Sequence, residues 1–127
     1  MSSDSGSRQP DAARPRFELP AVRAIDIRRV DYEPPRRRNF ESAFAGVREA
    51  MEFLVTTAGP IPMRAVGAAL YVGETAVVEM QRLDDTHYRF LAFDLDRLAD
   101  GAPIALGWTG DRREERRPTE FRFAAGH

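Results

Sequence analysis

The stretch that decides the fold covers residues 67–108 and reads GAALYVGETAVVEMQRLDDTHYRFLAFDLDRLADGAPIALGW. Its apolar runs are rich in β-branched and aromatic residues, and short polar segments at residues 73–75 and 84–86 separate them. Runs of this kind are typical of antiparallel strands joined by tight turns. The stretch therefore predicts four consecutive strands.

Three more strand candidates lie outside this stretch, which brings the expected number to about seven. Short strands at this spacing suit an antiparallel immunoglobulin-like β-sandwich, so the expected fold class is mainly β. Alternating apolar residues on neighbouring strands predict one core, formed by Phe90, Ile104, Leu106, Trp108, Phe121 and Phe123. The strands are expected at residues 21–32, 50–57, 68–72, 76–83, 87–94, 102–108 and 119–123.

The first strand candidate changes phase along its length. Ile25 and Ile27 share one face, whereas Val30 and Tyr32 share the opposite face. A change of phase at residues 28–29 predicts a β-bulge there, or a strand that passes from one sheet to the other.

Residues 39–57 fit two interpretations. Five apolar residues recur at steps of four and three, which is helical spacing, while residues 51–57 alternate like a strand. One interpretation is a short helix near residues 39–50, followed by a strand from about residue 50. The alternative is an α+β fold, in which one longer helix at residues 39–55 lies on an antiparallel sheet. The helical set is Phe40, Phe44, Val47, Met51 and Leu54.

The length and composition bound the organisation of the chain. A chain of 127 residues suits about one domain, expected at residues 17–124. Residues 1–16 lack large apolar side chains and predict a disordered tail, and residues 125–127 predict a short C-terminal tail. No run of residues approaches the ~20 apolar residues of a membrane span, and the N-terminus lacks the apolar core of a signal peptide. We therefore expect a soluble cytoplasmic protein.

The ionisable residues exclude several kinds of chemistry. The chain has 19 basic and 20 acidic residues, and every basic residue is Arg. Without Lys there is no Schiff-base or P-loop lysine, and without Cys there is neither a disulfide nor a thiolate nucleophile. The near-neutral balance differs from the strongly basic composition of most nucleic-acid-binding domains.

The order of several short features resembles a known family. Val72-Gly73 ends one predicted strand, Gly101 precedes another, and residues 121–123 form an aromatic last strand. Over about residues 66–123 this order resembles the IPT/TIG-type immunoglobulin-like domains of the early-set branch. The resemblance implies a binding or spacer module.

The first half of the chain departs from that family. The family opens with a glycine-rich pair of strands, whereas residues 36–50 of this chain carry an arginine run and helical spacing. Fold alone also does not fix function, so the candidate residues have to be weighed individually.

The candidates for catalysis and metal binding have ordinary structural explanations. His87 is the only internal histidine, and the neighbouring Asp84, Asp85 and Thr86 are typical of a hairpin turn. Zinc needs at least three protein ligands, which one internal His and no Cys do not supply. We therefore expect no catalytic, cofactor-binding or metal-binding residue and no enzyme activity.

Two further features have both a functional and a structural interpretation. Asp94, Asp96 and Asp100 suggest calcium, but Leu98 occupies a position where an EF-hand loop needs an oxygen ligand, so a solvated connection is favoured. Trp108 suggests a sugar-stacking platform, but its phase with the neighbouring strand residues favours the core.

The surface candidates are two arginine clusters. Residues 112–117 contain four arginines around two glutamates, which favours a solvated and nearly neutralised face. The other cluster lacks adjacent acids and lies close to two aromatic residues, a composition enriched at interface hot spots. The candidate interaction surface is therefore Arg36, Arg37, Arg38, Phe40 and Phe44.

These observations leave several function hypotheses. The leading one is a non-enzymatic binding or assembly module that contacts an unknown protein partner or a second copy of itself. The alternative is binding of a polyanion or nucleic acid through Arg36, Arg37 and Arg38. A carbohydrate-binding module, or an enzyme with an unrecognised site, is weaker. A sheet edge is also a candidate surface, although Arg28, Arg29 and the proline pair at residues 34–35 predict a guarded first strand.

Overall fold

The structure is a computed structural model that describes residues 19–32, 48–63 and 66–124. None of the helical segments in these ranges is long and apolar enough to cross a membrane. Two short 3-10 helices, η2 and η3, join strands of an otherwise β structure. The elements are β2 (Val22–Tyr32), β3 (Arg48–Thr57), β4 (Ala68–Val72), β5 (Thr75–Val77), β6 (Glu79–Asp84), β7 (His87–Ala92), η2 (Leu95–Arg97), β8 (Pro103–Trp108), η3 (Arg113–Glu115) and β9 (Arg117–Arg122).

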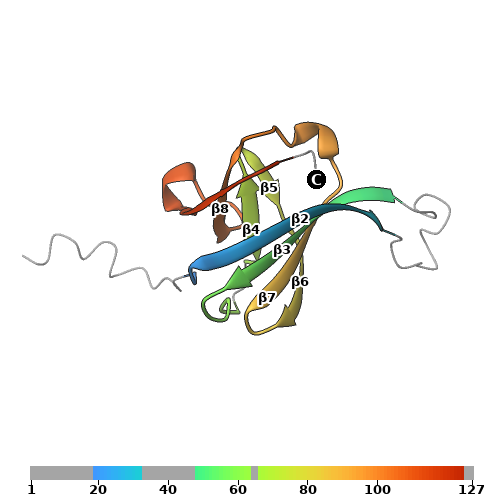
Figure 1. Cartoon of the computed structure of the whole chain (residues 1–127). Coiled ribbons are helices and arrows are strands. Elements are labelled where there is room, and N and C mark those ends of the chain that lie inside the picture. The colour runs from blue at the N-terminus through green and yellow to red at the C-terminus, as the bar shows by residue number, and fades with distance from the viewer. Residues whose placement is uncertain (1–18, 33–47, 64–65, 125–127) are drawn as a thin grey trace, which may run out of the picture.

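The strands form two antiparallel sheets that face each other (Figure 1). One sheet has the order β2-β3-β7-β6 and the other the order β5-β4-β8-β9. The mainly β sandwich expected from the sequence is confirmed. Immunoglobulin sandwiches place strands A, B, E and D in one sheet and C, F and G in the other, and the observed order follows this scheme with β5 as an additional edge strand.

One apolar core fills the space between the sheets. Phe53 and Phe90 of the first sheet and Leu106 of the second are each fully buried. The rings of Phe53 and Phe123 lie 5.9 Å apart between centroids, which ties β3 to the residue after β9. The expected core is confirmed, with Phe121 packed against it as a half-buried residue.

One expected strand is two strands in the structure. Residues 76–83 were predicted as one element, but β5 belongs to the second sheet and β6 to the first. Val77 points into the core, Val78 and Glu79 are both exposed, and Met80 packs against the core again, so the alternation slips where the chain crosses between sheets. A run of two adjacent valines conceals this crossing in the sequence.

The helical interpretation of the segment before β3 is partly overturned. β3 begins at Arg48 and pairs with β2 up to Tyr32, so the predicted helix over residues 39–55 is wrong. The shorter helix predicted near residues 39–50 is wrong for residues 48–50, which belong to β3. Cross-strand pairing of the inward Met51 and Phe53 outweighs the helical spacing. The rest of that expected helix lies outside the described residues, as do the expected tails at residues 1–16 and 125–127.

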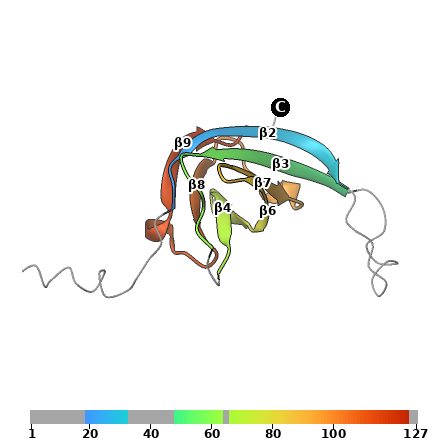
Figure 2. The ribbon, with the colours of Figure 1, turned by 90° about the horizontal axis from the view of Figure 1, so that it is seen from below.

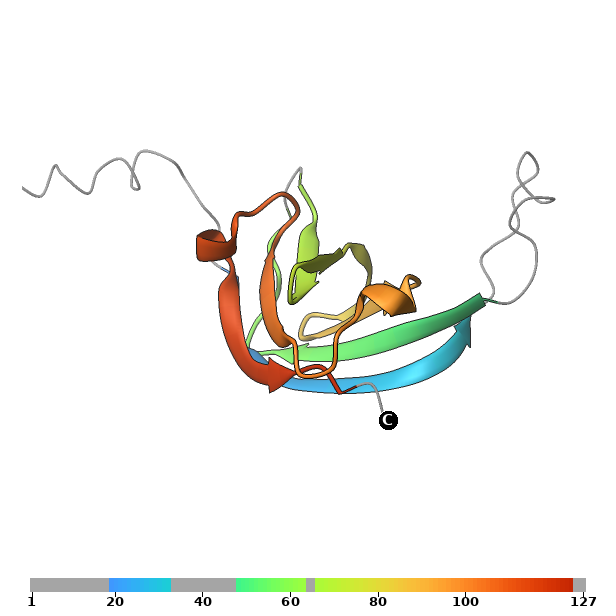
Figure 3. The same cartoon turned by 90° about the horizontal axis from the view of Figure 1, so that it is seen from above.

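The change of phase in β2 has a different cause from the one expected. The register is continuous from Ala24 to Tyr32, and the irregularity lies between Val22 and Ala24 rather than at residues 28–29. Ile25 and Ile27 pack against the core. Beyond them the β2–β3 hairpin leaves the sandwich (Figures 2 and 3). The face that was inward then meets solvent, so apolar residues are no longer favoured on it.

We call the part of this hairpin beyond the sandwich the arm, formed by residues 29–32 and 48–50. The pairing of β3 with β7 begins at Met51 opposite Ala92, so residues 48–50 pair only with β2 in the described part of the chain. On the inward side of the arm Arg29 contacts Glu49, with 3.3 Å between Nη1 and Oε2.

Phe90→Ala should test the core. The ring has no exposed surface, so its removal leaves a cavity and should lower the free energy of unfolding by ~3–5 kcal/mol. Val78→Ala is the matched control, because this exposed side chain should change stability by less than ~0.5 kcal/mol. Urea unfolding measures both variants, and a loss under ~1 kcal/mol for Phe90→Ala would contradict the core assignment.

Candidate functional site

The interaction surface predicted from the sequence lies outside the described residues. Its position along the fold is nevertheless set by its neighbours. Tyr32 and Arg48 stand opposite each other at the end of the arm, so the connecting residues 33–47 leave and re-enter the fold there. All five residues of the predicted surface belong to this connection: Arg36, Arg37, Arg38, Phe40 and Phe44.

A buried carboxylate lies on the outer face of the first sheet, near the base of the arm. Glu52 is only 3% exposed, although it points away from the core. Its Oε1 lies 2.6 Å from Nε of Arg28 on β2, and its Oε2 lies 2.7 Å from Nε of Arg89 on β7. We call these three residues the Arg-Glu-Arg clamp.

The clamp ties three adjacent strands together. A buried carboxylate is costly unless charges and hydrogen bonds compensate it, and two guanidinium groups supply that compensation here. Arg28 donates a well-formed hydrogen bond, whereas the Nε–H of Arg89 is close to the carboxylate but not aimed at it. Both oxygens of Glu52 are therefore engaged in holding β2 and β7 to β3.

Sequence reasoning missed this clamp, although a signal was present. Glu52 lies between the core residues Met51 and Phe53, so strand alternation alone places it on the outer face. What the sequence did not reveal is that β3 is an inner strand with Arg on both neighbours.

An apolar cluster lies beside the clamp on the same outer face. Ala50 stands opposite Val30, and both point outward with Glu52 because alternate residues share a face. Ala50 is fully buried and Leu91 is 6% exposed. The rings of Tyr32 and Phe93 are 5.4 Å apart between centroids. The outer side of the arm thus carries Val30, Tyr32 and Ala50, whereas its inner side carries the Arg29–Glu49 ion pair.

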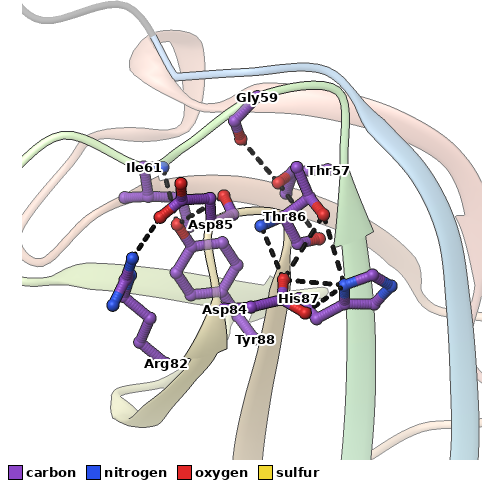
Figure 4. A network of polar contacts seen from close by, with 9 residues as sticks. All are labelled: Thr57, Gly59, Ile61, Arg82, Asp84, Asp85, Thr86, His87 and Tyr88. Atoms are coloured by element: carbon purple, nitrogen blue, oxygen red, sulfur yellow. Dashed lines mark hydrogen bonds and ion pairs between the residues drawn. The ribbon is translucent and has the colours of Figure 1, made fainter.

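His87 is the first residue of β7 and lies beside the turn between β6 and β7, as Figure 4 shows. The Oδ1 atom of Asp84 accepts a hydrogen bond from the backbone N–H of Thr86 at 2.9 Å and lies 2.8 Å from Nδ1 of His87. The hydroxyl of Thr86 lies 3.2 Å from the same Nδ1 atom. A hydrolytic triad needs the carboxylate and the nucleophile on opposite ring nitrogens, so this arrangement is a capped turn rather than a relay.

Buried hydrogen bonds anchor this turn to the body (Figure 4). The hydroxyl of Tyr88 accepts from the backbone N–H of Ile61 at 2.8 Å and donates to the carbonyl of Asp85 at 3.1 Å. The hydroxyl of Thr57 donates to the carbonyl of Gly59 at 2.6 Å. The network holds the connection after β3 against the β6–β7 hairpin.

The arginines of residues 112–117 are engaged within the fold. The guanidinium of Arg116 lies 3.9 Å from the centroid of the Tyr71 ring, a cation–π contact. Arg113 forms an ion pair with Glu74. Arg117 donates from Nη1 to the carbonyl of Leu19 at 2.7 Å. The prediction of a solvated, locally neutralised face holds in part, but Tyr71, Glu74 and Leu19 are partners that local sequence does not reveal.

An open groove of about 410 Å³ lies beside these arginines, on the second sheet. Pro103, Pro118 and Thr119 form part of its wall. The hydroxyl of Thr119 donates to the carbonyl of Ile104 at 2.7 Å, and Arg113 contacts Glu74. These polar groups of the groove are therefore paired within the protein.

The remaining candidates take structural positions. Asp94 forms an ion pair with Arg97 at 2.9 Å, and Gly101 has a φ of 81° in the turn before β8. Within the described ranges no three His, Cys, Asp or Glu residues lie close enough to hold a metal ion. Trp108 is 4% exposed and packs in the core, which was the favoured interpretation.

Comparisons of the chain with protein-family models, with curated proteins and with solved structures found no match.

The Arg-Glu-Arg clamp should contribute measurably to stability. Glu52→Gln removes the charge that two arginines compensate and should lower the free energy of unfolding by ~2 kcal/mol. Glu49→Gln is the matched control, since this exposed residue pairs with Arg29 and should change stability by less than ~0.5 kcal/mol. Equal losses in the two variants, measured by urea unfolding, would contradict a stabilising role of the clamp.

The turn at Asp84 should make stability depend on pH. The hydrogen bond from the backbone N–H of Thr86, and then that from His87, lowers the pKa of Asp84. A carboxyl with a lowered pKa in the folded state stabilises the fold above its unfolded pKa, and this contribution is lost as pH falls below about 4.

Asp84→Asn should therefore flatten the loss of stability below about pH 4, because the amide oxygen still accepts from Thr86 but does not titrate. Urea unfolding at several pH values measures the slope. An unchanged acid dependence in the variant would show that Asp84 does not contribute to it.

Proposed function

We propose that the chain is a non-enzymatic binding or assembly module that contacts a protein partner at the end of the arm. The observation that carries this proposal is the arm itself. Its two strands pair up to Tyr32 opposite Arg48, and Figure 3 shows the hairpin reaching past the strands of the second sheet. The connecting residues 33–47 are therefore attached to the fold at the end of the arm.

The composition of the connection supports a protein partner. It contains three consecutive arginines at residues 36–38, followed by Phe40 and Phe44. Aromatic and Arg side chains are enriched among the residues that dominate binding energy at interfaces. Function is also disproportionately located on loops that a rigid scaffold positions.

The base of the arm supplies such a scaffold. The clamp joins β2, β3 and β7 just before the arm leaves the sheet, and Tyr32 packs its ring against Phe93. An ordered base lowers the entropy lost when a displayed segment docks on a partner.

The proposal includes the IPT/TIG type of immunoglobulin-like domain. The observed strand order supports it, as does the turn after Val72, where Gly73 has a φ of 61°. Gly101 likewise has a positive φ shortly before β8. A module of this type binds or spaces other domains, which agrees with partner contact through the arm.

The alternative is binding of a polyanion through the same three arginines. It predicts affinity for phosphate-rich ligands that weakens steeply with salt. A carbohydrate-binding module or an enzyme has less support, because Trp108 is part of the core and His87 is bound to its own turn.

Substitutions in the connection test the proposal. Arg37→Glu and Phe44→Ala, made singly, should each lower recovery of the partner at least ~10-fold, as expected for hot-spot residues. Affinity capture from the native cell with quantitative mass spectrometry measures recovery, and circular dichroism confirms folding. Arg97→Glu is the matched control, because Arg97 is an exposed residue on η2 and belongs neither to the arm nor to the connection.

Two outcomes would reject this function. If both variants keep the wild-type set of captured proteins, the end of the arm is not the binding surface. If Arg37→Glu abolishes salt-sensitive binding of a labelled DNA duplex while protein capture is unchanged, the polyanion alternative replaces the proposal.

A further inference from the structure

The four edge strands of the two sheets differ in how well they are protected from pairing. Edge strands are commonly protected by being very short, or by bulges, charges or proline. β5 has three residues, β6 has a register shift between Arg82 and Asp84, and β9 contains Pro118. β2 has 11 residues and no proline, and its register is continuous over all but its first two residues.

The two arginines that predict a guarded β2 are paired with acids on the neighbouring strand. Arg28 reaches to Glu52 and Arg29 reaches to Glu49, and both acids are on β3. Each guanidinium is therefore bound at one nitrogen by an acid on β3, while the Arg28 side chain stays 64% exposed. Within the described residues β2 pairs only with β3, so the backbone groups on its other side lack a strand partner.

We propose that β2 pairs antiparallel with β2 of a second copy of this chain, with the two-fold axis at Ile27. The two β2-containing sheets then become one continuous sheet. The surface lies along the edge of the sandwich and is separate from the end of the arm, so this inference does not depend on the proposed function.

The sequence of β2 is complementary to itself in this register. Ile27 is the middle residue of the strand, so an axis there pairs the full length of both copies. Asp26 then stands opposite Arg28 of the second copy, and symmetry makes this pair twice. Asp31 stands opposite Arg23 of the second copy, again twice. Opposite charges directly across a strand pair stabilise a sheet.

Three neighbouring registers bring like charges together. The outer faces stay on one side of the joined sheet only if the axis passes through a residue. An axis at Asp26 places this residue opposite itself and Arg23 opposite Arg29. An axis at Arg28 or at Arg29 places that arginine opposite itself. Like charges directly opposite each other are destabilising.

The outer-face charges remain available for this contact. Arg28 is 64% exposed although its Nε is bound to Glu52. A guanidinium has five N–H donors, so the other donors can reach the second copy's Asp26. The clamp then extends across the joined edge as an alternating row of acids and arginines.

Self-association tests the proposal, and Asp26→Arg is the decisive substitution. It places Arg opposite Arg28 twice in the dimer and should raise the dissociation constant at least ~10-fold. Glu79→Arg is the matched control, because it makes the same charge change on the same sheet at the opposite edge strand, β6. Light scattering over a dilution series from millimolar concentration measures the mass of each full-length protein.

The expected result is a reversible dimer that Asp26→Arg weakens and Glu79→Arg preserves. A wild-type chain that stays monomeric at millimolar concentration overturns the proposal. So does a dimer that both substitutions weaken equally, or that Asp26→Arg leaves unchanged. Partner capture by Asp26→Arg should stay at the wild-type level, which separates this surface from the end of the arm.

A distance measurement tests the register. The chain has no Cys, so Ala24→Cys provides a single site for a nitroxide label. With the axis at Ile27, Ala24 stands opposite Val30 of the second copy, and the two Ala24 backbones should lie ~21 Å apart. Moving the axis by one residue changes this distance by ~7 Å. Pulsed electron paramagnetic resonance measures the distance between the two labels. A distance that fits an axis at another residue overturns the assignment of the axis to Ile27.

Discussion

The packing of two sheets across one apolar layer is the interaction on which the rest of the structure depends. Phe53 and Phe90 from the first sheet meet Leu106 and Phe123 from the other side, and all four are buried. Because this layer fixes which residues of β3 point inward, it also fixes that Glu52 points outward. The Arg-Glu-Arg clamp is therefore a consequence of the core, formed on the reverse side of the same strand.

The arm begins where the apolar layer between the two sheets ends. While β2 covers the core its inward residues are Ile25 and Ile27, and beyond them the same face carries Arg29. The outward face changes in the opposite sense, from Arg28 to Val30 and Tyr32. A single continuous strand can thus hold a domain together at one end and leave it at the other, without any bulge at the change.

Strand alternation made most of the fold predictable from the sequence. The positions of β4, β7 and β8 and the burial of Trp108 follow from local pattern, because each strand has one face on the core. Features that depend on which strands are neighbours were not predictable. The crossing at Val78 and the contact of Arg116 with Tyr71 require the sheet order, which local pattern does not contain.

For the candidate surfaces, too, local composition was predictable from the sequence, whereas features that depend on neighbouring strands were not. The arginine and phenylalanine residues at positions 36–44 were identified by composition, and the fold adds that their segment joins the end of an arm. The pairing of Arg28 with Glu52 and of Arg29 with Glu49 was not predictable, because both acids are on β3 and local sequence does not show which strand lies beside β2.

The hydrogen bond from Arg117 to the carbonyl of Leu19 spans 98 residues of chain, and it has a consequence for the newborn protein. On the ribosome the first sheet is complete once Ala92 has been made, yet β8, β9 and Phe123, which cover its apolar face together with β4 and β5, follow only with residues 103–123. At ordinary rates of synthesis that interval is roughly 2–6 s. During it Phe53 and Phe90 lack part of the layer that buries them, including Leu106 and Phe123.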